Sequence, residues 1–282
     1  MGDRRDDSAA GFGIPPQRIV SLINLDVLYG LSDRLSLELT IPFAIGSAAV
    51  AVPAGEDSHQ IYRYRASGLG DVTLQAEYWL SDPAAPSRVT GSIGLGFKAP
   101  TGVDSAQATA PGEDSPAPID ESAQLGTGGW EIILRAQGTA RLKGSLFAYA
   151  SGYYGLTVEE HTKVLNHGAL RAVPDTYSGR LGAAYLLPWA DGLFFSLGGR
   201  INGVTVRDVI GGGDLYWRRP GYVVYVEPGL TWTFGANSMA SVSVPVRTYA
   251  NKLDSPLDVS LNRRIGASFA SYLLLASYAR RF

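Results

Sequence analysis

The chain lacks cysteine altogether, and this absence removes several classes of protein at once. Of its 282 residues none is cysteine, and only two are methionine. Without thiols the chain can form no disulfide framework, no thiol nucleophile and no cysteine-ligated zinc site. The absence suits a protein that crosses an oxidising periplasm, although many cytosolic proteins also lack cysteine.

Long hydrophobic runs are missing as well. No purely apolar run is longer than the one at 272–276, whereas a transmembrane helix needs roughly twenty apolar residues. The first segment, MGDRRDDSAAGFGIPPQ, carries charges but no apolar stretch, so it does not read as a signal peptide. We expect residues 1–17 to be loop-like or disordered.

Neither sign of charge is in large excess, and no cofactor motif is present. The net charge is −2, so no general attraction to nucleic acid is expected. Glycine-rich stretches at 91–96 and 211–213 are not followed by a helical pattern, which a phosphate-binding loop would require. Strand bending explains these glycines better, and we expect no cofactor.

What the sequence does contain is a repeated alternation of apolar and polar side chains. In LSLELTIPF at 35–43, apolar side chains occupy every second position. Successive side chains of a strand point to opposite faces, so the pattern describes a sheet that is apolar on one face and polar on the other. Closed into a barrel with the apolar face outward, such strands satisfy every backbone group in lipid.

About eleven such segments predict an all-β fold, a transmembrane antiparallel up-and-down β-barrel of about 12 strands over residues 18–282. Short and long connections alternate, as do the periplasmic turns and extracellular loops of bacterial outer-membrane barrels. The loop at 100–126 is acidic, proline-rich and aperiodic, so we expect it to be mobile. The predicted strands span 19–31, 35–43, 70–80, 88–99, 129–140, 145–158, 177–187, 193–205, 221–233, 239–249 and 264–281.

The number of readable strands is odd, and this conflicts with the rule for bacterial barrels. Single-chain barrels have an even number of strands and keep both termini in the periplasm. We therefore expect one further strand, either a weak one near 9–14 or, as we favour, one upstream of this sequence. Without it the barrel would have two open strand edges, which are costly in lipid.

The end of the chain also has a barrel-like pattern. The last segment, ASYLLLASYARRF, places aromatic and apolar residues at every second position and ends on Phe282. It resembles the terminal strand of outer-membrane barrels, and the resemblance implies the barrel-insertion machinery as a partner. Arg280 departs from the apolar pattern, but an arginine at the membrane edge can reach water.

Three stretches in order resemble a family of outer-membrane transporters named for the meta-cleavage pathway of phenol degradation. They are YGLSDRLSLELTIPF at 29–43, GLGDVTLQAEYWL at 68–80 and GSIGLGFKAPTG at 91–102. The match covers about the first hundred residues, and the remainder agrees in strand rhythm. The resemblance implies passage of hydrophobic or aromatic compounds across the outer membrane.

Charged side chains on the polar face are the candidate permeation residues. A wet, charged lumen selects solutes by size and electrostatics. The alternative is that these charges pair across a narrow barrel and fill it, since eight-stranded barrels are packed and open porins have sixteen or more strands. The candidates are Asp26, Glu38, Asp71, Glu77, Lys98, Glu131, Arg135, Arg180, Arg200, Glu227 and Arg247.

An enzyme or a metal site is not expected. The three histidines, His59, His161 and His167, all fall in predicted loops without metal-binding spacing, and no supported catalytic set is present. We therefore expect a passive outer-membrane channel for small hydrophobic or aromatic molecules, in contact with lipid. The alternatives are a non-transporting barrel with a plugged lumen, and a soluble lipocalin-like carrier with its apolar face inward.

Overall fold

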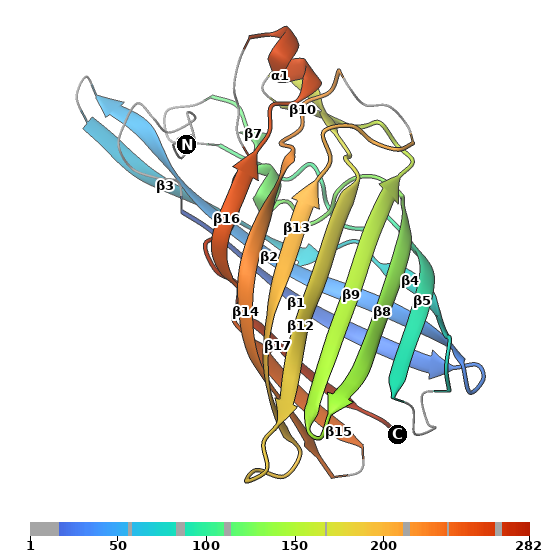
Figure 1. Ribbon diagram of the computed structural model, residues 1–282. Coiled ribbons are helices and arrows are strands. Elements are labelled where there is room, and N and C mark those ends of the chain that lie inside the picture. Colours follow the sequence, from blue (N-terminus) through green and yellow to red (C-terminus); the bar gives the residue numbers. More distant parts are fainter. Residues whose placement is uncertain are drawn as a thin grey trace.

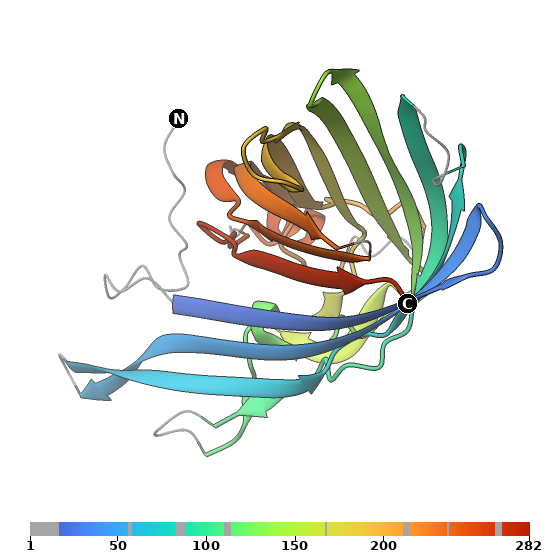
Figure 2. The same ribbon diagram turned by 90° about the horizontal axis from the view of Figure 1, so that it is seen from below.

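The chain forms one strongly curled antiparallel sheet with loops gathered at one end (Figures 1 and 2). The computed structural model describes residues 17–55, 58–82, 88–109, 114–166, 168–210, 215–235, 237–262 and 267–282. Within these ranges nearly all regular structure is β. The predicted all-β antiparallel fold is confirmed.

Eleven strand positions follow one another across the sheet in the order of the sequence. Two positions are each shared by two shorter strands, because β3 and β4 both pair with β2, and β15 and β16 both pair with β14. The strands are β1 (Gln17–Gly30), β2 (Leu35–Gly55), β3 (Ser58–Leu69), β4 (Thr73–Trp79), β5 (Val89–Lys98), β8 (Glu131–Lys143), β9 (Leu146–Thr157), β12 (Thr176–Leu186), β13 (Leu193–Val204), β14 (Gly221–Phe234), β15 (Ser238–Ser243), β16 (Val246–Lys252) and β17 (Leu275–Arg280).

The largest departure from the predicted strands lies between β2 and β3. The segment 44–66, expected to be a loop, instead extends both strands as a hairpin whose pairing reaches Gly55 and Ser58. Side chains at 61–69 alternate between exposed and half-buried, as in a regular strand. Most residues at 44–52 are small or apolar, so polar and apolar side chains do not alternate there. The strand predicted from the sequence was therefore too short.

The two faces of the sheet differ in chemistry as the alternation predicts. On the outer face, Leu95, Leu181 and Leu197 are 52%, 68% and 51% exposed. On the inner face, Ser92 and Glu227 are each only 2% exposed. A water-soluble carrier would reverse this arrangement, so the outer face fits lipid and not water.

Aromatic side chains lie toward both ends of this apolar surface. Along β14, Tyr222 and Trp232 lie near opposite ends of the strand. At ~3.3 Å per residue and a strand tilt of ~40°, their separation corresponds to a height of ~25 Å, the thickness of the apolar band of outer-membrane barrels. Outward aromatic residues lie at the same two levels: Phe43, Trp130, Tyr154 and Tyr249 toward the long-loop end, and Tyr29, Tyr185 and Trp232 toward the short-turn end.

Strands β1 and β17 are the two edges of the sheet. Among the described residues, β1 pairs only with β2, and β17 only with β15. Because every neighbouring pair between them is antiparallel, both edge strands run toward the short-turn end. In the part of the chain that the structure describes, no strand joins these edges, and the segment near 9–14 lies outside it. A twelfth strand therefore stays a prediction, and β17 is shorter than the predicted 264–281.

The long-loop end carries the remaining short elements (Figure 1). Two small hairpins pair β6 (Gln107–Ala108) with β7 (Ala117–Pro118), and β10 (His161–Asn166) with β11 (Ala169–Ala172). The helices are the 3-10 turn η1 (Glu121–Ala123) and α1 (Pro256–Ser260). Among the described residues no helix has the length and hydrophobicity needed to cross a membrane.

The orientation of the two faces leads to a stability prediction. Leu134, 45% exposed on the outer face of β8, should not tolerate a charge. Leu134→Lys should lower the free energy of unfolding in lipid by about 2–4 kcal/mol, the cost of a lysine or arginine near the bilayer midplane. Gln75→Lys, on the inner face of β4, should cost much less. Urea unfolding of the refolded protein in lipid vesicles measures both, and equal costs would contradict the assignment of faces.

Candidate permeation site

Charged residues from most strands converge on the inner face of the sheet, and we call the space that this face encloses the lumen. Alternation along each strand, together with the pairing register, turns them all to the same side. Only Asp71 lies outside a strand, in the link between β3 and β4. The inward-facing candidates are Asp26 (β1), Glu38 (β2), Glu77 (β4), Lys98 (β5), Glu131 and Arg135 (β8), Arg180 (β12), Arg200 (β13), Glu227 (β14) and Arg247 (β16).

One cluster is centred on the carboxylate of Glu227. Arg180 and Arg200 are directly paired across β12 and β13, so their side chains emerge together. Nη2 of Arg180 and Nε of Arg200 each lie 2.7 Å from a Glu227 carboxylate oxygen, and the Ser243 hydroxyl donates to it at 2.9 Å. Two guanidinium groups share one carboxylate, so the cluster carries a net positive charge.

The opposite wall of the lumen holds most of the acidic residues. Nη1 of Arg135 lies 3.0 Å from Glu38, and Nζ of Lys98 lies 2.6 Å from Glu131. Glu77 has no cationic partner among the described side chains and instead accepts hydrogen bonds from Ser92 Oγ and Gln137 Nε2, each at 2.5 Å. Tyr153 also donates to Glu131. The lumen wall is therefore more negative near β4 and more positive near β12 and β13.

Three other candidates have different surroundings. Asp26 accepts a 2.7 Å hydrogen bond from the Thr40 hydroxyl of the neighbouring strand. Arg247 donates to the backbone carbonyl of Phe269 at 2.9 Å. Asp71 accepts hydrogen bonds from the backbone N–H groups of Gly102 and Thr127, at 3.0 and 2.8 Å. Asp71 thus anchors both ends of the long loop, a role that its position in the sequence did not reveal.

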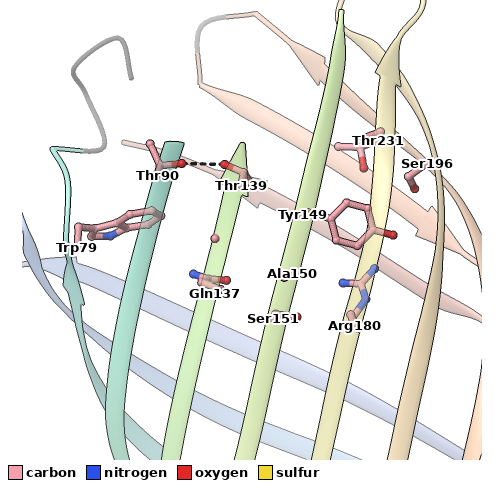
Figure 3. A pocket seen from close by; sticks show the side chains of 12 residues that line it. Trp79, Thr90, Gln137, Thr139, Tyr149, Ala150, Ser151, Arg180, Ser196 and Thr231 are labelled. Atoms are coloured by element: carbon pink, nitrogen blue, oxygen red, sulfur yellow. Dashed lines mark hydrogen bonds between the residues drawn. The ribbon is translucent and has the colours of Figure 1, made fainter. Parts of the chain in front are cut away.

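A cavity of about 310 Å³ lies in the half of the lumen nearest the short turns (Figure 3). Its wall combines two aromatic rings, one guanidinium group and several hydroxyl groups. Of this lining only Arg180 is among the candidates predicted from the sequence, although the other polar side chains lie at inward-facing positions of the same alternation. The lining residues are Trp79, Thr90, Gln137, Gly138, Thr139, Tyr149, Ala150, Ser151, Arg180, Ala184, Ser196 and Thr231.

Two glycines set the position of Tyr149 in this cavity. Gly182 and Gly198 are paired across β12 and β13, next to Tyr149 on β9. A Cβ at either glycine would lie 2.4 Å from the Tyr149 hydroxyl oxygen, so the ring can lie against the wall only because both side chains are absent. The guanidinium carbon of Arg180 lies 5.5 Å from the centre of the same ring, a cation–π geometry.

The described residues of the loop at 99–130 contact the sheet at the long-loop end of the lumen, and we call this segment the cover of the mouth at that end. The mobility expected from its composition stays a prediction. Besides the contacts with Asp71, the backbone N–H of Asp120 donates to the Tyr64 hydroxyl at 3.0 Å. The Asp120 carboxylate lies 2.9 Å from Nη2 of Arg18 on β1 and 3.4 Å from Nη1 of Arg219. These contacts tie η1 both to the edge strand and to the loop before β14.

Burial and neighbouring arginines shift the pKa values of two acidic residues in this cover. Burial opposes ionisation of Asp120, but Arg219 and Arg18 outweigh it and hold the pKa of Asp120 below its ordinary value of 3.8. Next to it, burial raises the pKa of Glu121 even though Arg171 and Arg219 oppose the change. Arg171 is itself bound by the backbone carbonyls of Asp104 and Thr127, at 2.9 and 3.3 Å.

The histidines do not assemble into a site in the described structure. The His161 ring lies 4.3 Å from the ring of Tyr216, centre to centre, and its Nδ1 lies 2.8 Å from the Thr162 carbonyl oxygen. His167 and the side chain of His59 lie outside the described part. Among the described residues no group of three or more histidine, aspartate or glutamate side chains could hold a metal ion.

Comparison with solved structures identifies the fold. The chain is similar to the COG4313 outer membrane channel from Pseudomonas putida F1, with a TM-score of 0.61 and 17% sequence identity, over 95% of this chain and 85% of that one. The fold is that of an outer membrane channel. No family model and no curated protein matches the chain, so membership of the phenol-pathway transporter family stays a prediction.

The cavity leads to a prediction about conductance. Tyr149→Ala removes the ring that lies over Gly182 and Gly198, so it should widen the lumen and raise the single-channel conductance in a planar bilayer. Tyr185→Ala, on the outer face of the same sheet and 44% exposed, is the matched control and should leave conductance unchanged. If Tyr149→Ala has no effect, the cavity does not lie on the conduction path.

The cover over the mouth leads to a second prediction. Asp120→Asn removes the charge that Arg18 and Arg219 share, and should weaken local closure by about 1.5–3 kcal/mol, the range for hydrogen bonds to charged groups. Limited proteolysis within 99–130 should accelerate by at least about tenfold, since 1.4 kcal/mol is a factor of ten. Asp114→Asn, exposed in the same loop, is the control. Equal rates would show that Asp120 does not hold the cover.

The lowered pKa of Asp120 sets the pH dependence of the same assay. The stabilisation from its ionised form is fully present above the ordinary value of 3.8 and is lost as the pH falls through the lowered pKa. Wild-type protection should therefore persist down to about pH 4 and disappear only below it.

Proposed function

We propose that the protein is an outer membrane channel through which small hydrophobic or aromatic compounds diffuse down their concentration gradient. The apolar outer band and the aromatic residues at its two ends support the location, because this distribution matches a bilayer of ordinary thickness. The polar inner face supports passage of solutes through the lumen, and no cofactor is needed for passive diffusion.

The observation that carries the proposal is the cavity lining at the short-turn end of the lumen. The rings of Trp79 and Tyr149 offer flat apolar surface to an aromatic compound, and rings pair favourably in offset or edge-to-face geometry. Hydroxyl groups of Thr90, Thr139 and Ser196 surround the same space and can bond polar substituents. Such a lining binds weakly in many orientations, which suits a solute that has to leave again.

The loops at 100–126 and 159–175 are the proposed gates. Both fold over the extracellular mouth, the first through Asp71 and Asp120, the second through the β10–β11 hairpin. Opening would require separation of the cover from β1 and from Arg219. Access from the bilayer through the barrel wall is the other route by which a hydrophobic compound could reach the cavity.

A plugged, non-transporting barrel is the second candidate function. The ion pairs of Arg135 with Glu38 and of Lys98 with Glu131 cross between strands within the lumen. Their side chains are less than two-fifths exposed, as in small barrels whose interior is filled. In this case the protein would serve as a structural or surface-binding protein.

The proposed partners follow from the same surfaces. Lipid acyl chains contact the apolar band, and small permeants contact the lumen. The barrel-insertion machinery would recognise the C-terminal strand, whose last residue, Phe282, is fully exposed. No nucleic acid partner is proposed.

Single-channel conductance of the refolded chain in a planar bilayer tests the proposal. Arg200→Gln removes one positive charge beside Glu227 and should shift the reversal potential in a salt gradient toward cation preference. Glu38→Gln leaves Arg135 unpaired and should shift it toward anion preference. Asp33→Asn, in the short turn between β1 and β2, changes charge by one unit outside the lumen and should have little effect.

Two outcomes would separate the candidates. Steady conductance that responds to Arg200→Gln and Glu38→Gln supports an open lumen. A folded protein that never conducts, with or without these changes, rejects diffusion through the lumen and favours the plugged barrel.

A further inference from the structure

We propose that the outward face of β3 binds the phosphate groups of lipids in the outer leaflet, through Arg63 and Arg65. The proposal rests on the outer membrane location given above but not on conduction through the lumen. The lipid that the site fits is a phosphorylated glycolipid such as lipid A, with its phosphates at the arginines and its acyl chains on the apolar band.

The orientation of the two arginines follows from contacts on the opposite face of β3. Tyr64, between them in sequence, accepts the 3.0 Å hydrogen bond from the Asp120 backbone in the cover of the lumen. Successive side chains of a strand point to opposite faces, so Arg63 and Arg65 point away from the protein. Both are exposed, whereas Tyr62 and Tyr64 are half-buried.

The outward face changes from apolar to basic at the point where the bilayer surface is expected. Leu69, near the end of β3, is 56% exposed, and its neighbours in the same row, Phe43 on β2 and Ile23 on β1, are 41% and 63% exposed. Further along the same face of β3 (Figure 1, light blue) toward the hairpin tip come Ser67, Arg65 and Arg63, followed by Ile61, which is 49% exposed. Acyl chains and a charged headgroup would meet this face in the same order.

Among the described side chains of this outward face, the charged ones are all positive. The outward residues that pair with Arg63 and Arg65 on β2 are Ala49 and Ser47, and no carboxylate among the described residues forms an ion pair with either arginine. By contrast Arg18, on the inward face of β1, is held by Asp120. Two neighbouring guanidinium groups with no described carboxylate beside them match a phosphate, which the planar guanidinium binds through paired N–H donors.

Lipid, and not a soluble polyanion, is the occupant that the surroundings favour. On the same outward face, the exposed row of Leu69, Phe43 and Ile23 lies four residues along β3 from Arg65. A soluble polyanion bound at the arginines would leave these apolar side chains in contact with water. The site lies at the long-loop end, which faces the cell exterior in barrels of this kind. Each basic residue near an anionic membrane surface adds favourable binding energy.

Binding of purified lipid A to the full-length protein in detergent micelles, followed by native mass spectrometry, tests the proposal. Arg63→Gln combined with Arg65→Gln should weaken binding of lipid A with two phosphates by ~10–30-fold, as expected for two surface arginines. Arg34→Gln combined with Lys163→Gln removes the same charge from two exposed positions elsewhere and should have no effect. Dephosphorylated lipid A should bind the wild type as weakly as it binds the arginine double variant.

Several results would overturn the proposal. They are equal affinity of the two double variants for lipid A, equal wild-type affinity for lipid A with and without phosphates, and binding of inorganic phosphate as tight as that of the lipid. Arg63→Lys combined with Arg65→Lys preserves charge and serves if the glutamine variant fails to fold. It should bind with intermediate affinity, and wild-type affinity would exclude recognition through the paired N–H donors.

Conductance measurements on the arginine double variant distinguish failure of the lipid-binding proposal from failure of the proposed channel function. The arginine double variant should conduct like the wild type, because both side chains lie outside the lumen. A wild-type protein that binds lipid A but does not conduct would reject the proposed channel and leave the lipid site standing.

Discussion

Backbone hydrogen bonding in lipid is the constraint on which the rest of this structure depends. A bilayer offers no water to the N–H and C=O groups of a crossing strand, so each strand has to pair along its length with two neighbours. Along the continuous path of the curled antiparallel sheet, every strand between β1 and β17 pairs with two neighbours, whereas β3 and β16, which lie off this path, each pair with one strand. Once the backbone is paired in this way, side chains have only two directions available, toward lipid or toward the lumen.

The electrostatics of the lumen follow from that division. Polar side chains excluded from the lipid face crowd the inner one, where they must find partners or bind water. Cross-strand pairing places Arg180 and Arg200 together beside Glu227, while Glu38, Glu77 and Glu131 lie toward the other wall. The same geometry that fills part of the lumen with ion pairs leaves a cavity below them, where Gly182 and Gly198 allow Tyr149 to lie against the wall.

Contacts in the loops are not determined by the alternation that determines those in the strands, because the loops lie outside the lipid and have no regular period. Asp71 and Asp120 each hold segments that are far apart in the sequence. A composition rich in proline and acid predicts a mobile loop at 100–126, and this stays a prediction; within the described part of the loop, the acidic residue Asp120 is held by Arg18 and Arg219. The β2–β3 hairpin was not predicted, because small residues at 44–52 weaken the alternation of polar and apolar side chains. These residues nevertheless allow the two strands to pair.

The amino-acid sequence by itself determined the all-β class, the order of the readable strands and the face on which each charged candidate within a strand lies. These properties depend on a period of two within single strands, which is local. Only the tertiary structure decided which charges meet, that Trp79 and Tyr149 line a cavity, and that Asp71 supports a loop. Such contacts depend on the register between strands and on the path of loops, and neither is encoded in the periodicity of any one segment.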